Sequence, residues 1–115
     1  MENEFETLRT ASVARNKIWD PSGRRSACFK ATELAGEVGE VCNIVKKLER
    51  NALGLIGSTS SAADLADELA DVVICLDMLA EEYDIDLWPA IVQKFNATSK
   101  KVKIPVYITD VGEPE

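Results

Sequence analysis

The chain has no histidine among its 115 residues. This absence excludes Ser-His and Cys-His nucleophilic catalysis, most zinc sites, and the Glu-x-x-His signature of di-iron helical bundles. Any acid–base chemistry must therefore come from carboxylates, lysine, tyrosine or metal-bound water.

Cysteines and long apolar runs are also scarce. Cys28, Cys42 and Cys75 are odd in number and match no Cys-x-x-Cys spacing, which argues against a disulfide framework and a zinc ribbon. The longest apolar run, at residues 72–76, is far too short to span a membrane. The N-terminus, MENEFETLRT, is acidic and lacks the apolar stretch of a signal peptide. We therefore expect a cytoplasmic protein with no membrane partner.

Positive charge is missing from the middle of the chain. Residues 51–93 contain nine Asp or Glu and no Lys or Arg, whereas residues 94–103 contain four Lys, and the formal net charge is −7. Such an acidic chain is a poor nucleic-acid binder, so we expect no nucleic-acid partner. If it handles an anionic ligand, it needs cations as intermediaries.

Strand patterns are nearly absent, and helical patterns dominate. Apolar periodicity and helix-end signals predict four helices followed by an extended tail. The helices are expected at residues 2–18, 28–50, 62–83 and 86–103, and the tail at 104–115. The sequence thus predicts a single all-α domain over residues 1–115, with its motif core at 28–103, folded as a four-to-five-helix antiparallel bundle.

The second and third predicted helices each carry an apolar row. The rows are Leu34, Val38, Val41, Val45 and Leu48, and Leu65, Leu69, Val72, Leu76 and Leu79. The third helix is apolar over more than one stripe, because Val73, Ile74 and Met78 lie beside its row. This width suggests burial on two sides, and we expect the second side to contact another subunit. We therefore expect a homodimer or a homotetramer built as a dimer of dimers.

Two stretches within these helices repeat one pattern at an offset of 31 residues. ELAGEVGEV at 33–41 and DLADELADV at 64–72 both place an acid at the first, fifth and eighth positions. Each of these acids precedes an apolar-row residue by one, so each helix carries an acid row about 100° from its apolar row. If the apolar rows pack antiparallel, the two acid rows can converge at the edge of the bundle.

Converging carboxylates are hard oxygen ligands that suit Mg²⁺ or Mn²⁺ rather than a soft metal. Gly36 and Gly39 lie along the other flank of the first acid row and leave room for a ligand, at about 1 kcal/mol each relative to alanine in a helix. The alternative is a solvated acidic face with no bound ion, which is how most acidic runs end up.

The four acids also resemble a known signature. Glu37-x-x-Glu40, then 27 intervening residues, then Glu68-x-x-Asp71, is similar to the ExxE…ExxD motif of the all-α nucleoside triphosphate pyrophosphohydrolases. The EVGEV and DELADVV contexts look most like the MazG-like branch, which is related to dCTP pyrophosphatase and the dimeric dUTPases. The resemblance covers about residues 28–103.

This resemblance implies magnesium-dependent hydrolysis of a (deoxy)nucleoside triphosphate to the monophosphate and pyrophosphate, as nucleotide house-cleaning. It assigns Glu37, Glu40, Glu68 and Asp71 as catalytic magnesium ligands, with Glu37 or Glu40 orienting the attacking water. Phosphoribosyl-ATP pyrophosphohydrolase and dUTPase activities are alternatives within the superfamily. A non-enzymatic, acidic helical interaction module is an alternative of another class.

Four further residues are candidates for binding the substrate. The segment KFNATSKK resembles a family segment that supplies a lysine and a nearby amide, which implies that Lys94 contacts phosphate and Asn96 contacts metal or ribose. Lys47 lies seven residues past Glu40 on the same helix face and could also reach phosphate. Trp19 lies near the position of a base-stacking aromatic in some relatives, and core packing is the alternative for it.

Overall fold

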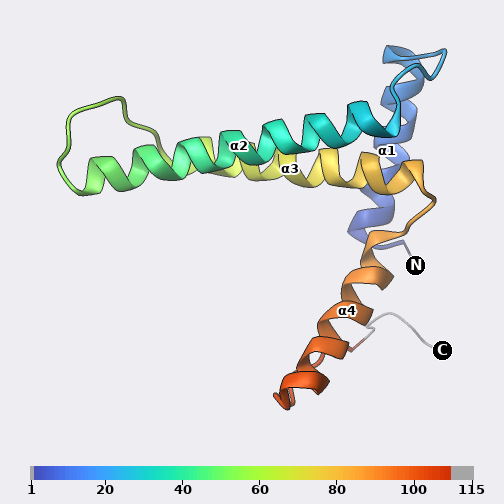
Figure 1. Cartoon of the computed structure of the whole chain (residues 1–115). Helices are drawn as coiled ribbons and strands as arrows, with labels where there is room; N and C mark the ends of the chain where they lie inside the picture. The colour runs from blue at the N-terminus through green and yellow to red at the C-terminus, as the bar shows by residue number, and fades with distance from the viewer. Residues whose placement is uncertain (1, 110–115) are drawn as a thin grey trace.

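The computed structural model describes residues 2–109, and it is all-α over this range (Figure 1). Its four helices are α1 (Glu4–Trp19), α2 (Ala27–Ala52), α3 (Ala62–Glu82) and α4 (Leu87–Val102). Each predicted helix is confirmed to within two residues at either end. Residues 104–109 lack regular secondary structure, and the rest of the predicted tail, 110–115, lies outside the described residues.

Side-chain caps explain why the helices begin where they do. Asn3 and Glu6 form a reciprocal capping box at α1, and Ser61 and Asp64 form another at α3. The Ser26 hydroxyl accepts a hydrogen bond from the Phe29 N–H at the start of α2. Local hydrogen bonds therefore define these three starts independently of tertiary packing.

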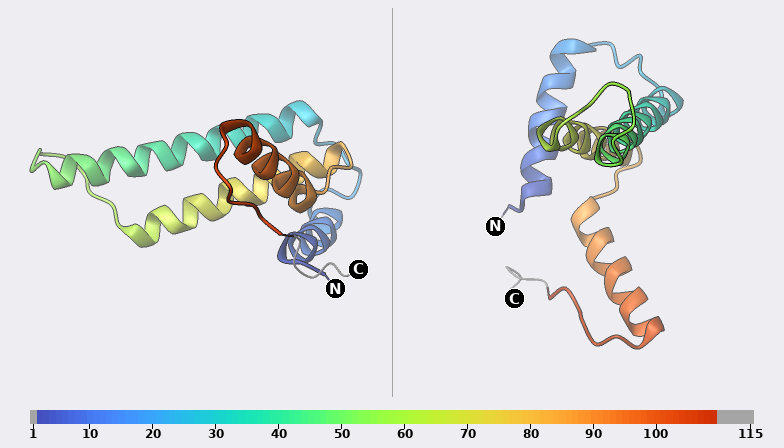
Figure 2. Two further views of the ribbon diagram at one scale, coloured as in Figure 1. Left: turned by 90° about the horizontal axis from the view of Figure 1, so that it is seen from below. Right: turned by 90° about the vertical axis from the view of Figure 1, so that its left-hand side faces the viewer.

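An antiparallel hairpin of α2 and α3 is the main tertiary unit, and α1 crosses α3 near its C-terminal end (Figures 1 and 2). Alternate members of each predicted apolar row lie between α2 and α3, where they are partly buried. These members are Leu34, Val41 and Leu48 on α2, and Leu65, Val72 and Leu79 on α3. The other members, including Val38, Val45, Leu69 and Leu76, remain exposed.

Ion pairs fix the open end of the hairpin. The Lys30 ammonium, near the start of α2, donates to the Glu82 carboxylate at the end of α3 over 2.7 Å. At the opposite end, the Arg50 guanidinium donates to the Ser58 carbonyl in the loop after α2. The Lys30–Glu82 pair thus joins α2 to α3 at one end of the hairpin, and the Arg50 contact holds the connecting loop to α2 at the other.

Arg9 of α1 joins three segments at the base of the hairpin. Its guanidinium forms a two-pronged pair with the Asp77 carboxylate of α3, at 2.9 and 3.0 Å, and Asp77 is 1% exposed. It also donates to the Ile85 carbonyl over 2.7 Å, in the turn that leads into α4. The Phe5 and Trp88 rings stack beside it with centroids 6.1 Å apart. Arg9 therefore holds α1 and the start of α4 against α3.

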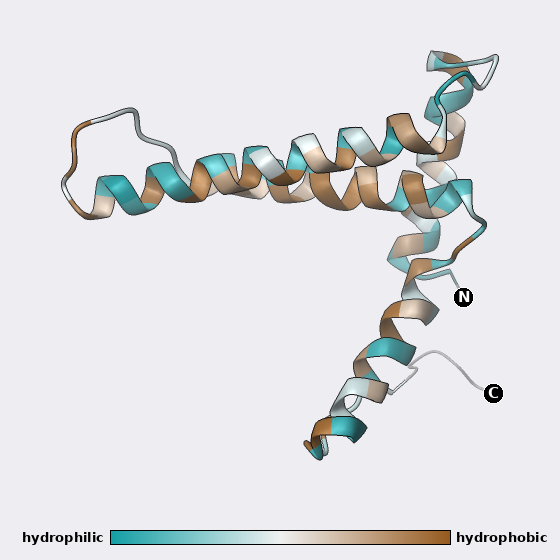
Figure 3. Cartoon of the chain, viewed as in Figure 1, coloured by the Kyte–Doolittle hydropathy of each residue, from teal (hydrophilic) through white to brown (hydrophobic). Residues whose placement is uncertain are grey.

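Beyond its first turn, α4 leaves the hairpin instead of packing along it (Figures 1 and 2). The four helices therefore do not close into one compact bundle within a single chain. The radius of gyration is 17.8 Å, compared with about 13 Å for a compact domain of this length. Among the described residues the buried hydrophobic side chains are Met78 and Ala80, and apolar colour lies open along α3 in Figure 3. No helix within residues 2–109 is long and apolar enough to cross a membrane.

We predict that Asp77→Ala destabilises the protein by about 3 kcal/mol or more, because it leaves the largely buried Arg9 guanidinium without its carboxylate partner. The matched control is Asp67→Ala, an exposed acid on the same helix, which is expected to change stability by less than about 0.5 kcal/mol. Urea unfolding followed by circular dichroism measures both. Equal effects of the two substitutions would contradict the structural role given to Arg9 and Asp77.

Candidate metal centre

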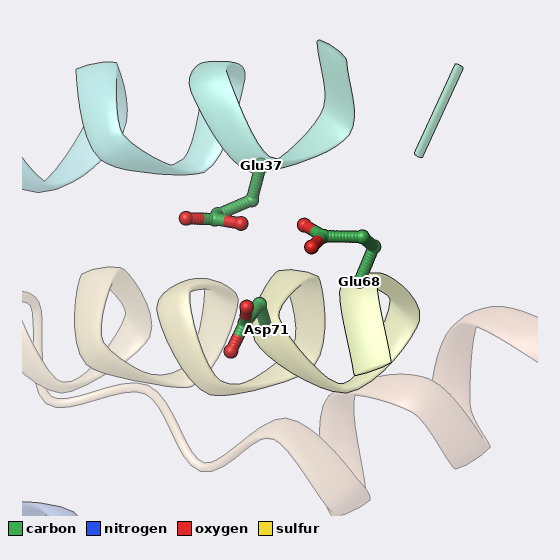
Figure 4. Close-up of side chains that lie close together, drawn as sticks. All are labelled: Glu37, Glu68 and Asp71. Atoms are coloured by element: carbon green, nitrogen blue, oxygen red, sulfur yellow. The ribbon is translucent and has the colours of Figure 1, made fainter. Parts of the chain in front are cut away.

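The two copies of the repeated pattern face each other across the α2–α3 hairpin. Glu37 points from α2 toward α3, and Glu68 extends from α3 toward it, with Asp71 one turn further along α3 (Figure 4). One carboxylate oxygen from each of the three residues lies within 4.8 Å of the others. The convergence predicted from the acid rows is therefore present for these three residues.

The cluster brings three acidic side chains close together, so that their negative charges repel one another. Partial burial, hydrogen bonding with the Glu37 carboxyl, and repulsion from Glu37, Asp71 and Glu40 all raise the pKa of Glu68. No Lys or Arg lies between residues 51 and 93 to relieve the repulsion within α3. A cation placed among the three carboxylates would relieve it.

The donor set fits a hard divalent ion. Ligand oxygens on opposite sides of an octahedral Mg²⁺ are about 4.2 Å apart, because Mg–O distances are about 2.1 Å. The observed spread of up to 4.8 Å therefore requires only small rotations of exposed or half-exposed side chains. Three carboxylates leave the remaining coordination positions for water and phosphate oxygens.

Glu40 lies one turn beyond Glu37 on α2, and its side chain is exposed. It contributes to the repulsion felt by Glu68, but its oxygens are outside the converging set of three. Its assignment as a fourth ligand stays a prediction.

The first acid of each copy has a separate partner. Asp64 accepts hydrogen bonds from Ser60 and from the Ser61 backbone, and these bonds hold its pKa below the usual range. Asp64 thus acts as a capping acid at the start of α3. Glu33 pairs with Arg25 over 3.0 Å and does not belong to the converging set.

A cavity of about 230 Å³ adjoins the cluster, between α1, α3 and the loop before α2. Asp71 lines it together with Asn16, Trp19 and Arg25. The Arg25 guanidinium stacks 4.4 Å from the centroid of the Trp19 ring, which is 65% exposed and hence not part of a core. Trp19 therefore lies on the same side of the molecule as the carboxylates, with one ring face taken by Arg25.

Arg25 ends the basic segment PSGRR at residues 21–25, and the sequence predicts no role for it. The buried Asp20 carboxylate accepts hydrogen bonds from the backbone N–H groups of Arg24 and Arg25, and this turn carries the Arg25 side chain back over Trp19. Arg25 also donates to Asn16. The sequence Asp-Pro at a helix end predicts a turn, but no sequence spacing predicts the position of the Arg25 side chain.

The three other candidate residues differ in position. Lys47 lies near enough to Asp64 to help lower its pKa, so it is on the acid side of the hairpin toward the tip. Within one chain the structure does not bring Lys94 or Asn96 to the cluster, because α4 diverges (Figure 1). The Asn96 amide accepts from the Ile108 N–H at 2.7 Å and donates to the Ile108 carbonyl at 2.9 Å, which ties residue 108 to α4.

Comparisons with models of known protein families, with curated proteins and with solved structures found no match for this chain.

Proposed function

We propose that this protein is a magnesium-dependent nucleoside triphosphate pyrophosphohydrolase of the MazG-like kind, with Mn²⁺ as an alternative ion. The observation that carries the proposal is the convergence of Glu37, Glu68 and Asp71 from two copies of one sequence pattern. Three like charges gathered on facing helices weaken the metal-free fold, so a bound cation gives them a physical reason to be together.

The reaction would proceed by attack of water on the α-phosphorus. A bond forms between the water oxygen and phosphorus, the bond to the bridging oxygen breaks, and pyrophosphate leaves. Magnesium, when bound, supplies neutralisation of the triphosphate charge and activation of water. Glu37 or Glu40 would orient that water and accept its proton, and no protein nucleophile is required, which agrees with the absence of histidine.

The cavity beside Asp71 supports a place for one end of the nucleotide. At about 230 Å³ it is smaller than a whole small-molecule site of roughly 300–1,000 Å³, so it would hold the base or sugar while the phosphates remain at the carboxylates. Trp19 offers a ring for stacking, and Asn16 and Arg25 offer polar groups. Lys47, on the acid side of the hairpin, and Lys94 remain the proposed phosphate contacts.

We also propose that the enzyme works as a homodimer or a dimer of dimers that clears non-standard or surplus nucleotides. The large exposed apolar surface of the single chain supports self-association. The same surface is what favours the alternative of a non-enzymatic interaction module, which would bind a different protein and turn over no nucleotide.

Release of pyrophosphate from a panel of ribo- and deoxyribonucleoside triphosphates, with and without Mg²⁺, tests the proposal. Turnover of at least one triphosphate is expected, and it should stop when the metal is chelated. Phosphoribosyl-ATP and dUTP belong in the panel because they identify the two alternatives within the superfamily. Absence of turnover of every compound by folded protein would contradict the enzyme proposal.

Glu37→Gln and Glu68→Gln are expected to abolish turnover and yet leave the metal-free fold at least as stable as the wild type. The raised pKa of Glu68 determines the direction of the pH dependence of stability. The folded state binds the Glu68 proton more tightly than the unfolded state does. Ionisation of Glu68 therefore destabilises the fold as the pH rises from about 4.3 through the pKa of the folded state. The difference in unfolding free energy between Glu68→Gln and wild type should therefore grow in favour of the variant from pH 4 to pH 7.

Urea unfolding in the presence of a chelator measures this difference, and Asp67→Asn is the control because Asp67 is an exposed acid on α3 outside the cluster. Unfolding of either Gln variant would assign Glu37 or Glu68 a structural role instead.

A further inference from the structure

The end of α1 and the loop that follows it carry an excess of positive charge. Residues 15–25 contain four Lys or Arg and one Asp, although the whole chain has a formal net charge of −7. This end of α1 and its loop project beyond the α2–α3 hairpin (Figures 1 and 2). Positive charge is therefore concentrated at one corner of an acidic molecule.

Three of these cations lie at the cavity beside Asp71, and we name them the arginine rim: Arg15, Arg24 and Arg25. Arg15 and Arg25 line the cavity itself. Arg24 is their neighbour, because its Nε lies 4.0 Å from the Asp20 carboxylate, which also lies 3.7 Å from the Nε of Arg25. The rim therefore belongs to the walls that α1 and its loop contribute to the cavity, whereas Asp71 belongs to the wall that α3 contributes.

Two members of the arginine rim are not neutralised by the protein. Arg25 pairs with Glu33 over 3.0 Å. By contrast, none of the ion pairs within residues 2–109 includes Arg15. The Arg24 side chain is 82% exposed and has the long contact with Asp20, whose carboxylate oxygens already accept two backbone N–H groups. A neutral nucleobase in the cavity would leave the Arg15 and Arg24 guanidinium groups without an anion.

One face of α1 forms its wall of the cavity. The residues on this face are spaced by three and four, and they are Ser12, Arg15, Asn16 and Trp19. Lys17 is exposed as Arg15 is, but it lies about 160° around the helix from Arg15 and is not among the residues that line the cavity. The same turn of α1 thus carries one cation toward the cavity and one away from it.

The carboxylate cluster, the cavity and the arginine rim follow one another in space. Asp71 belongs to both the cluster and the cavity, and Arg15 belongs to both the cavity and the rim. The cavity of about 230 Å³ is smaller than a whole small-molecule site of roughly 300–1,000 Å³, so a nucleotide must extend beyond it. With the triphosphate at the carboxylates and the base or sugar in the cavity, the rim meets whatever the nucleotide carries at its other end.

We propose that the arginine rim binds a second phosphate group, which the nucleotide carries on the far side of its base or sugar from the triphosphate. Guanidinium groups bind phosphate through paired, charge-assisted hydrogen bonds, and the rim offers two that lack an anion. This inference rests on the proposed function, because it requires the triphosphate to lie at the carboxylates. It names the substrate class as nucleoside 5′-triphosphates with a second phosphate, linked through the base or attached to the sugar.

Hydrolysis of three compounds by the full chain with Mg²⁺ tests the inference. They are ATP, phosphoribosyl-ATP, whose second phosphate is on a ribose linked to the base, and ATP phosphorylated at its 3′-hydroxyl. At least one of the two compounds with a second phosphate should have a kcat/KM at least ~10-fold above that of ATP, the size expected for a charge-assisted hydrogen bond. This advantage should be largely lost in Arg15→Gln and Arg24→Gln and kept in Lys17→Gln, the matched control on the opposite face of α1. The ratio of the two kcat/KM values is unchanged by a general loss of folded protein.

Failure of this inference is distinguishable from failure of the proposed hydrolysis. Turnover of ATP with no advantage for either doubly phosphorylated compound would overturn the inference and leave the hydrolysis standing. An advantage that both arginine variants keep, or an equal loss for ATP and the preferred compound, would also overturn it, because the rim would then not bind the second phosphate. If folded protein turns over none of the compounds, the hydrolysis fails, and calorimetric titration with the same compounds and Mg²⁺ decides. Binding of a doubly phosphorylated compound at least ~10-fold tighter than that of ATP, and weakened in Arg15→Gln, would support the rim, whereas equal affinities would overturn it.

Discussion

The packing of α2 against α3 brings together side chains that repel one another. Leu34, Val41 and Leu48 meet Leu65, Val72 and Leu79, and this apolar contact holds the hairpin closed. Glu37 lies three residues after Leu34 and four before Val41, and Glu68 stands in the same relation to Leu65 and Val72, so both lie beside the contact face of their helix. Closing the hairpin therefore brings Glu37 and Glu68 together, with an oxygen of Asp71 within 4.8 Å. Hydrophobic burial at the contact therefore offsets the repulsion among the carboxylates, and partial burial together with this repulsion raises the pKa of Glu68.

The hairpin has different surfaces on its two flanks. On one flank lie the carboxylates, with the cavity that contains Trp19 and Arg25 beside Asp71. On the other lie exposed apolar side chains, such as those of Val38, Leu69 and Leu76. The Arg9–Asp77 pair holds α1 at the base of the hairpin, where α1 forms one wall of the cavity. The carboxylate cluster and the exposed apolar residues of the hairpin therefore lie on opposite flanks.

Much of this arrangement is predictable from the sequence because it depends on local signals. Ser61 with Asp64, and the turn at Asp20-Pro21, place helix ends to within two residues. The repeated acid pattern locates the convergence of Glu37, Glu68 and Asp71 because helical periodicity maps directly onto faces.

The sequence does not predict which apolar-row residues face the hairpin contact or which way α4 runs. Residues spaced by four and three lie on one broad helix face and not on a single line. The same predicted rows therefore contain Val41 and Val72, which are partly buried, and Val38 and Leu69, which are exposed. The path of α4 depends on a turn in which Asp84 has a left-handed conformation, with φ of 55°, and on the contact from Arg9 to Ile85. No periodicity contains that information, and for the same reason Lys94 and Asn96 could not be placed relative to the carboxylates.

The central claim is that the carboxylates on facing helices form a divalent-ion site and not merely a solvated acidic face. Binding of Mn²⁺ to the metal-free protein, followed by loss of the electron paramagnetic resonance signal of the free ion, tests it most directly. Saturable binding is expected for the wild type and for Asp67→Asn, and binding weakened by at least ~10-fold is expected for Glu68→Gln and Asp71→Asn, because each of these two substitutions removes one of the three converging carboxylate ligands. Equal and slight weakening by all three substitutions would contradict it.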